Sequence, residues 1–270
     1  MREPMVVAAG ESELVGDRWA GGGPVAVLLH AGVADRRSFY EVAEALAGPL
    51  TVVAYDRRGY GGSAPSPDSF SHVDDLLAVL DVVGDGPVWL VGSSMGGGLA
   101  LDAALVAPDR VAGLVLLAPA VSGAPEPASD PVLDQLENRM ASAIASGDLA
   151  VINEAEISLW LDGPAGPEGR VAGERRRLAL EMNAVVLAYD VLEDTGASGV
   201  DAWGRLDEVL VPVTVGCGDL DVSFLVARSL ELARRLPRGR HQVLEGMAHL
   251  PYLEDPLGVA RLISDAVTGR

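Results

Sequence analysis

The sequence predicts an α/β fold: a mostly parallel β-sheet that is flanked by helices and interrupted by a helical insertion. Short apolar runs recur along the chain, and continuous apolar runs are typical of strands buried on both faces, as in a parallel sheet. Segments with the one-sided apolar spacing of amphipathic helices lie between these runs. This alternation of strands and helices indicates the α/β class. One long region without strands indicates the insertion.

Each expected strand is a short run made up mainly of apolar residues. In chain order the runs are 25–29 (VAVLL), 51–55 (TVVAY), 88–91 (VWLV), 113–117 (GLVLL) and 211–215 (VPVTV), and a further strand is expected at 240–244. Helices are expected at 38–47, 73–83 and 222–236, and Pro256 can open a last helix in its first turn. In the helix at 73–83, apolar residues repeat at i, i+3 and i+4, which gives it a single apolar face.

The alternation stops between residues 121 and 203, where no convincing strand is present. The region opens with a loop rich in Pro, Ala, Gly and Ser (SGAPEPASDP), and helical stretches follow at 131–146, 148–161 and 171–191. The simplest interpretation is a helical cap, residues 121–203, over the working edge of a core that residues 1–120 and 204–270 form.

Composition excludes several classes of function. The chain has 270 residues and a net charge of −19, and arginine supplies all 20 of its basic residues. Without lysine, Schiff-base and lysine-anchored pyridoxal chemistry are excluded, and so acidic a surface repels nucleic acid and anionic membranes. Cys217 is the single cysteine, so no disulfide can form within the chain. The four histidines lack the spacing of metal ligands, so neither a metal nor another cofactor is expected.

The expected cellular location rests on two features that the sequence does not show, a membrane-spanning stretch and a signal peptide. It contains no apolar stretch of the roughly 18 residues that a membrane-spanning helix needs. Its first residues carry charges and lack the apolar core of a signal peptide. We therefore expect a cytoplasmic protein, and the sequence leaves its oligomeric state open.

The stretch VGSSMGGGL places small residues between an apolar run and a helical run. A G-x-S-x-G pattern at a strand-to-helix turn is typical of a nucleophile elbow, in which a tight turn lifts the serine above the sheet. Ser94 meets this pattern because glycines stand two positions before and after it, whereas Val91 and Met95 flank Ser93. The N-terminus of the following helix favours developing negative charge. Ser94 is therefore the predicted nucleophile.

A serine hydroxyl needs a base beside it, and in the elbow arrangement an acid and then a histidine follow later in the chain. His249 lies in a loop between the strand expected at 240–244 and the last helix. The acid should follow the strand at 211–215, where Asp219 and Asp221 compete. Asp221 is preferred because it stands at the tip of the turn before the next helix, and its task would be to hold the imidazole tautomer.

An oxyanion hole needs two backbone N–H donors. One is the amide of Met95, directly after the predicted nucleophile, and the other is expected in the loop after the strand at 25–29. Gly32 is the preferred second donor, and Val33 is the alternative.

Taken in order, these motifs resemble those of the α/β-hydrolase superfamily over nearly the whole chain. The matching segments are LLHAG at 28–32, YDRRGYGGS at 55–63, GSSMGG at 92–97, GDLD at 218–221 and GMAHLPYLEDP at 246–256. The usual His-Gly pair of the first segment is His-Ala here. In this family Asp56, Arg57, Gly59 and Gly61 belong to a turn beside the site, and the resemblance implies a structural role for them.

The resemblance implies that Ser94 attacks an acyl carbon while His249, oriented by Asp221, takes its proton. The protein would then be a serine hydrolase that cleaves an ester or lactone of a small molecule through an acyl-enzyme intermediate. The elbow and the cap resemble those of small esterases and enol-lactonases, which points to a small ester-like substrate.

Trp160 and Met182 in the cap, together with Val33, are the candidates for lining the substrate pocket. A serine at the elbow speaks against epoxide hydrolases and haloalkane dehalogenases, which have an aspartate there. Carbon–carbon bond hydrolases and some lyases keep the same triad, and thioesterases and acyltransferases also remain. A non-catalytic receptor of the same fold, binding a small molecule in the same pocket, is the alternative from a different class.

Overall fold

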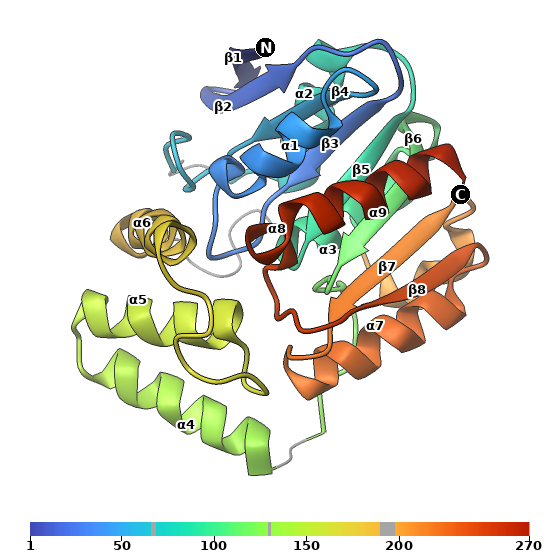
Figure 1. Cartoon of the computed structure of the whole chain (residues 1–270). Coiled ribbons are helices and arrows are strands. Elements are labelled where there is room, and N and C mark those ends of the chain that lie inside the picture. Colours follow the sequence, from blue (N-terminus) through green and yellow to red (C-terminus); the bar gives the residue numbers. More distant parts are fainter. Residues whose placement is uncertain (66–68, 129–130, 190–197, 270) are drawn as a thin grey trace.

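The computed structural model describes residues 1–65, 69–128, 131–189 and 198–269. Its strands form an eight-stranded sheet in the order β1-β2-β4-β3-β5-β6-β7-β8 (Figure 1). Their bounds are β1 (Arg2–Ala9), β2 (Ser12–Trp19), β3 (Val25–Leu29), β4 (Thr51–Tyr55), β5 (Val88–Ser93), β6 (Val111–Leu117), β7 (Val213–Gly218) and β8 (Gly239–Leu244). All pairings from β4 to β8 along this order are parallel. The prediction of a mostly parallel sheet is confirmed.

The strands β1 and β2 form an antiparallel hairpin that a search for apolar runs does not detect. The hairpin lies at the edge of the sheet, and buried and exposed residues are mixed along both strands. Gly10 makes the turn between them with a φ of 60°, a conformation in which a side chain is strained. β2 pairs antiparallel with β4 and so joins the hairpin to the parallel strands.

Helices cover both faces of the parallel strands. Outside the segment between β6 and β7 they are α1 (Tyr40–Leu46), α2 (His72–Val83), α3 (Met95–Val106), α7 (Ser223–Arg235), α8 (Pro251–Glu254) and α9 (Pro256–Thr268). Leu101 of α3 shares one core with Val27 of β3, and α2 and α7 join that core. Ile263 of α9 shares the second core with Leu28, and α1 joins it. The run VAVLL is apolar throughout because alternate residues of β3 enter opposite cores.

Among the described residues between β6 and β7, the α-helices are α4 (Pro131–Ala145), α5 (Leu149–Ile157) and α6 (Glu174–Tyr189), which gather beside the sheet in Figure 1. α5 packs against both α4 and α6. The helix predicted at 148–161 continues from α5 into a π-helical turn, Ser158–Asp162. The helix predicted at 171–191 begins later, at Glu174, and its last two residues lie outside the described ranges.

A buried carboxylate holds the turn after β4. Asp56 accepts hydrogen bonds from the backbone N–H groups of Arg36 (2.8 Å) and Gly62 (2.7 Å), and it forms an ion pair with the Arg36 guanidinium. Burial raises the pKa of Asp56 to about 6. Gly61 has a φ of 50°, and a Cβ atom there would lie 2.2 Å from the Asp56 carboxylate. Asp56 and Gly61 therefore make structural contacts within the turn.

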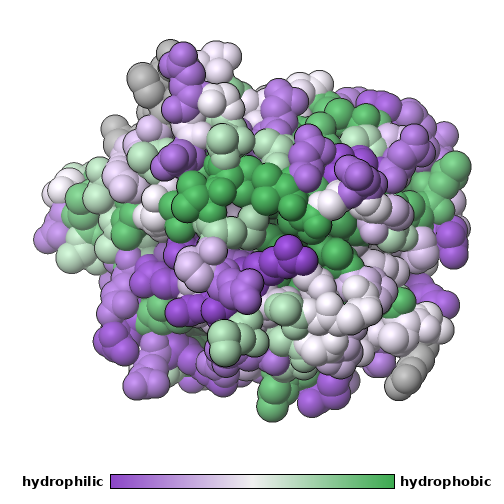
Figure 2. Space-filling view, turned by 90° about the horizontal axis from the view of Figure 1, so that it is seen from above, coloured by the Kyte–Doolittle hydropathy of each residue, from purple (hydrophilic) through white to green (hydrophobic). Residues whose placement is uncertain are grey.

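The surface seen from above in Figure 2 shows a hydrophobic band between regions of hydrophilic side chains. Several large apolar side chains of α4 and α5 are exposed, among them Ile144 and Leu149. None of the described helices combines the length and the apolar character that crossing a bilayer requires.

Candidate active site

Ser94 stands at a sharp turn between β5 and α3, with a φ of 52° and a ψ of −118°. A positive φ is strained for a residue with a side chain, and such strain is concentrated at functional sites. The Ser94 N–H donates to the carbonyl oxygen of Leu117 at 2.9 Å. The Ser94 carbonyl oxygen accepts from the N–H of Ala120, also at 2.9 Å. The end of β6 and the loop after it therefore hold the strained turn in place.

Glycines surround Ser94 because the turn leaves no room for side chains. A Cβ atom at Gly92 would lie 2.2 Å from the carbonyl oxygen of Gly96. A Cβ atom at Gly96 would lie 2.2 Å from the carbonyl oxygen of Leu29, and one at Gly98 would lie 2.0 Å from that of Ala120. The G-x-S-x-G spacing is thus a steric requirement of this strand-to-helix turn.

His249 and Asp221 form a buried hydrogen-bonded pair. His249 Nδ1 lies 2.8 Å from Asp221 Oδ2, and the side chains are 3% and 0% exposed. The second carboxylate oxygen, Oδ1, accepts from the Val222 N–H at 2.7 Å and so fixes the rotation of the carboxylate. A histidine that donates from Nδ1 presents Nε2 as the basic nitrogen. The pair can therefore accept a proton at Nε2.

The two aspartates that compete in the sequence have different partners. Asp219 Oδ1 accepts a hydrogen bond from the Gly246 N–H at 2.7 Å. Among the described residues, the imidazole of His249 is hydrogen-bonded to Asp221 and not to Asp219. Asp219 therefore fastens the start of the loop that contains His249, whereas Asp221 contacts the histidine itself.

Ser94 and His249 line the same cavity, which has a volume of about 740 Å³. The hydrogen bonds of the described residues do not include one between the Ser94 hydroxyl and the imidazole. Such contacts are often long before substrate binds. The cavity lies between the loops that follow β3 and β5 and the helices α5 and α6.

The backbone N–H groups of Met95 and Gly32 form no hydrogen bond within the described part of the chain. Both residues line the cavity, and a Cβ atom at Gly32 would lie 2.7 Å from Met95 Sδ, so the two are neighbours. Met95 is also the first residue of α3, where the helix dipole is positive. Two unused donors beside Ser94 can stabilise an oxyanion.

His30 supports the loop that contains Gly32, a role that the sequence analysis misses. Its Nε2 accepts from the Arg57 N–H at 3.1 Å, so Nδ1 carries the proton that is donated to the Ala31 carbonyl oxygen at 2.8 Å. Burial and the neighbouring Arg57 guanidinium hold the pKa of His30 well below its usual value, so the ring is neutral. Its position directly after a buried apolar run is the sequence signal for this role.

The predicted pocket residues have different positions. Trp160 and Val33 line the cavity, and the Trp160 ring lies 4.5 Å from the His249 ring, centroid to centroid. The Trp160 carbonyl oxygen also accepts from the His249 N–H at 3.2 Å. Met182, in contrast, is fully buried in the core with Ile157 and is not part of the cavity wall. It lies on the face of α6 that packs against its neighbours.

Arg170 joins the helical insertion to the loop that contains His249. Its guanidinium donates to the carbonyl oxygens of Leu161 (2.9 Å), Asp162 (3.0 Å) and Gly246 (3.0 Å). It also forms a 2.5 Å ion pair with Glu254, whose Oε1 accepts from the N–H of Ala248, the residue before His249, at 2.7 Å. We call this set of contacts the Arg170 clamp.

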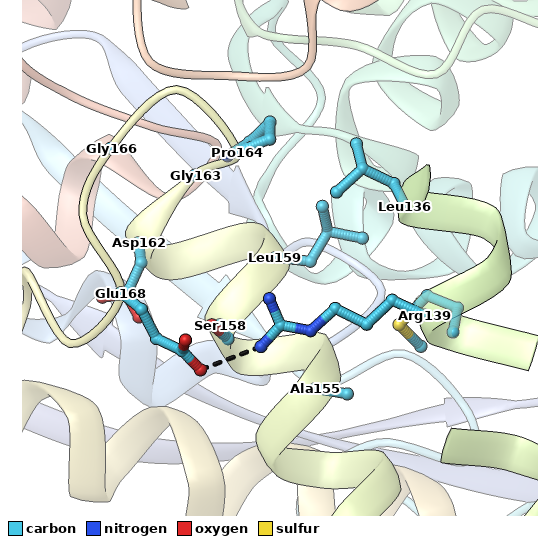
Figure 3. A pocket seen from close by; sticks show the side chains of 11 residues that line it. Leu136, Arg139, Ala155, Ser158, Leu159, Asp162, Gly163, Pro164, Gly166 and Glu168 are labelled. Atoms are coloured by element: carbon cyan, nitrogen blue, oxygen red, sulfur yellow. Dashed lines mark hydrogen bonds and ion pairs between the residues drawn. The ribbon is translucent and has the colours of Figure 1, made fainter. Parts of the chain in front are cut away.

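A second, smaller cavity of about 120 Å³ lies between α4, the π-helical turn and the segment 163–168 (Figure 3). Arg139 and Glu168 form a 2.8 Å ion pair in its wall. It contains none of the predicted site residues. Within the described ranges, no group of three or more His, Cys, Asp or Glu side chains is arranged to hold a metal ion.

The fold and the elbow are those of the α/β-hydrolase class: a mostly parallel sheet with a strained serine at the turn from a central strand to a helix. The chain belongs to the alpha/beta hydrolase family, whose profile matches residues 26–262.

Relatives match over almost the full length. A Bacillus subtilis protein, provisionally named a 2-succinyl-6-hydroxy-2,4-cyclohexadiene-1-carboxylate synthase, is 27% identical over 279 aligned positions, covering 98% of this chain and 97% of its own. A thermophilic esterase from Thermogutta terrifontis has a TM-score of 0.78 at 24% identity, covering 100% of this chain and 98% of that one. The enol-lactonase from Burkholderia xenovorans LB400 has a TM-score of 0.76 at 20% identity, and the match covers 98% of this chain and 100% of the lactonase. These structures share the fold.

Proposed function

We propose that the protein is a serine hydrolase that cleaves a carboxylic ester or lactone of a small molecule through an acyl-enzyme intermediate. The observation that carries the proposal is the buried Asp221–His249 hydrogen bond in the wall of the cavity that the strained Ser94 also lines. The esterase and enol-lactonase with the same fold support this choice of substrate class.

The proposed reaction has two halves. Ser94 Oγ attacks the carbonyl carbon while His249 Nε2 takes the hydroxyl proton, and the same nitrogen then gives that proton to the leaving alcohol oxygen. Water, deprotonated by His249, attacks the acyl-enzyme, and the proton returns to Ser94 as the carboxylic acid leaves. Asp221 stabilises the imidazolium in both halves. The N–H groups of Met95 and Gly32 hold the oxyanion, and each donor is worth about 3–4 kcal/mol to the transition state.

We also propose that residues 121–203 act as a cap on a core of residues 1–120 and 204–270. The support is that α5, α6 and the π-helical turn supply one wall of the cavity, while loops of the sheet supply the other. In this arrangement Trp160, in the π-helical turn, would cover both the substrate and the imidazole.

A second candidate is cleavage of a carbon–carbon bond, or a lyase reaction, with the same three residues. It is favoured by the similarity to the Bacillus subtilis synthase over 98% of this chain. The name of that protein specifies a carboxylate, and the described residues that line the cavity here include no arginine to bind one. Ester or lactone hydrolysis is therefore the preferred function.

The test is labelling with a fluorophosphonate, followed by turnover of p-nitrophenyl esters and lactones of graded size. We expect one label per chain at Ser94 and hydrolysis of short neutral esters, and Ser94→Ala should abolish both. Ser93→Ala is the matched control, since Ser93 is buried and stands outside the cavity wall. A wild-type protein that binds small esters but is neither labelled nor active would be a receptor, and the proposal would be wrong.

A further inference from the structure

The direction of the Gly32 N–H depends on how the carbonyl group before it is held. The peptide between Ala31 and Gly32 is trans and planar, so the Ala31 carbonyl oxygen and the Gly32 N–H point in opposite directions. Gly32 lines the cavity, and its N–H has no hydrogen-bond partner among the described residues. The groups that bind the Ala31 oxygen therefore decide where the Gly32 N–H points.

Several donors meet at the Ala31 carbonyl oxygen. His30 Nδ1 donates at 2.8 Å, Arg57 Nη2 at 3.2 Å and the Ala34 N–H at 3.3 Å. The guanidinium of Arg57 is the charged donor of this group, because the buried His30 ring is neutral. Hydrogen bonds from charged donors are about twice as strong as neutral ones. A cation at the carbonyl oxygen also polarises the peptide, so that its N–H becomes a stronger donor.

The Arg57 guanidinium is buried, and no ion pair of the described residues includes it. Arg57 is 1% exposed, and its Nε–H has no hydrogen-bond partner in the described part of the chain. The neighbouring Arg58, in contrast, pairs with the Asp75 carboxylate at 2.7 Å. The Tyr60 ring, 4.6 Å from the Arg57 guanidinium carbon, offers a cation–π contact. A buried charge with so little compensation costs stability, and costs of this kind are expected at functional sites.

From this geometry we infer that Arg57 is a positioning residue of the oxyanion hole. It binds the Ala31 carbonyl oxygen on the side opposite to the Gly32 N–H, and it thereby points that N–H at the oxygen that becomes negative when Ser94 attacks. Because no described carboxylate lies within ion-pair distance of the guanidinium, its charge acts on this peptide without neutralisation. The inference rests on the proposed function, and it adds to the structural role that the family resemblance implies for Arg57.

Arg57→Met keeps the apolar stem of the side chain and removes the charged donor. We expect kcat for a p-nitrophenyl ester to fall by about 10–100-fold. This is less than the roughly 10²–10³-fold loss that follows removal of a whole oxyanion donor, because His30 and Ala34 still bind the carbonyl oxygen. KM should change by less than about threefold, because the oxyanion forms only in the transition state.

Inhibition by a trifluoromethyl ketone is a measurement that a purely structural role would not change. Ser94 Oγ bonds to the ketone carbon, its proton passes to His249, and the ketone oxygen becomes an oxyanion in the hole. The inhibition constant of the ketone should rise by the same factor by which kcat falls. The corresponding trifluoromethyl alcohol cannot form this adduct, so its inhibition constant should stay within about twofold of the wild-type value.

Arg58→Lys is the matched control, since Arg58 is the next residue, is 7% exposed and pairs with Asp75. It is not part of the cavity wall. Lysine keeps the positive charge but loses the two-pronged contact with the carboxylate, so the thermal midpoint should fall. The control's kcat and its inhibition constant for the ketone should stay within about twofold of the wild-type values. Arg57→Gln, which keeps a neutral donor, gives the same test if Arg57→Met fails to fold.

The inference is overturned if the Arg57 variants keep kcat within about twofold of the wild-type value. It is also overturned if kcat falls while the inhibition constant of the ketone does not change. A lowered thermal midpoint with kcat retained would assign Arg57 a structural role alone. Active wild-type protein with unaffected Arg57 variants refutes this inference only, whereas wild-type protein that is neither labelled nor active refutes the proposed function as well.

Discussion

The Arg170 clamp supports a quantitative prediction about the loop that contains His249. In Arg170→Met the apolar stem of the side chain remains, but three hydrogen bonds to carbonyl groups and the ion pair with Glu254 are lost. Removing one partner of a buried ion pair costs about 3–5 kcal/mol, because the other charge stays buried without compensation. Glu254 is 6% exposed and Arg170 is 19% exposed, so the lower end applies. We expect the free energy of unfolding to fall by about 3 kcal/mol.

The pH dependence of that loss follows from Glu254. Burial raises the pKa of Glu254, and Arg170 opposes the rise. Without Arg170 the pKa of Glu254 in the folded state increases further, whereas in the unfolded state it does not change. A raised folded-state pKa of an acid favours the folded state at low pH and loses that effect as the pH rises. The deficit of Arg170→Met should therefore be larger at about pH 8 than at about pH 5.

The assay is urea unfolding of the wild type, Arg170→Met, Glu254→Gln and the double variant. We expect the double variant to recover part of the loss, because no unpaired carboxylate remains. Arg139→Met is the control, because the side chains of its ion pair are exposed: 53% for Arg139 and 68% for Glu168. This substitution should lower the free energy of unfolding by less than about 1 kcal/mol. The reasoning fails if Arg170→Met costs no more than Arg139→Met, or if the two clamp substitutions are additive.

Three further predictions test other contacts. Asp221→Asn should lower ester turnover by about 10⁴-fold while Asp219→Asn lowers it far less, and the reverse ranking in kcat would assign the acid role to Asp219. Gly96→Ala should lower the free energy of unfolding by more than about 3 kcal/mol, because its Cβ atom would lie 2.2 Å from a backbone carbonyl oxygen. Gly22→Ala is the control, since a Cβ atom there meets no other atom within 4 Å. Equal thermal midpoints for the two variants would contradict the steric argument. Burial lowers the pKa of His72 in the folded state to about 3, whereas the pKa in the unfolded state is about 6.5. The neutral ring therefore favours the folded state above about pH 6.5, and this contribution to stability is lost as the pH falls. His72→Gln should therefore flatten the loss of stability between about pH 6 and pH 4, and unchanged pH profiles would speak against it.

Local patterns were sufficient for much of this protein. The run VAVLL predicts a strand buried on both faces because each of its residues must enter one of two cores, and β3 does so. The G-x-S-x-G spacing predicts the elbow: a Cβ atom at Gly92 would collide with Gly96 within the tight turn, and one at Gly96 would collide with Leu29 of the adjacent strand β3. The hairpin of β1 and β2 gives no such pattern, because a strand at the edge of a sheet tolerates polar residues.

The sequence by itself determined the parallel core, the position of Ser94 and the short list of partners for it, since each depends on neighbours in the chain. Only the tertiary structure decided that Asp221 rather than Asp219 contacts His249, that Met182 belongs to the core and Trp160 to the cavity, that Arg57 binds the Ala31 carbonyl oxygen, and that Arg170 stands near the site. These contacts join residues that are far apart in the chain. Their geometry depends on how the helices of the insertion pack against the loops of the sheet, which no local pattern encodes.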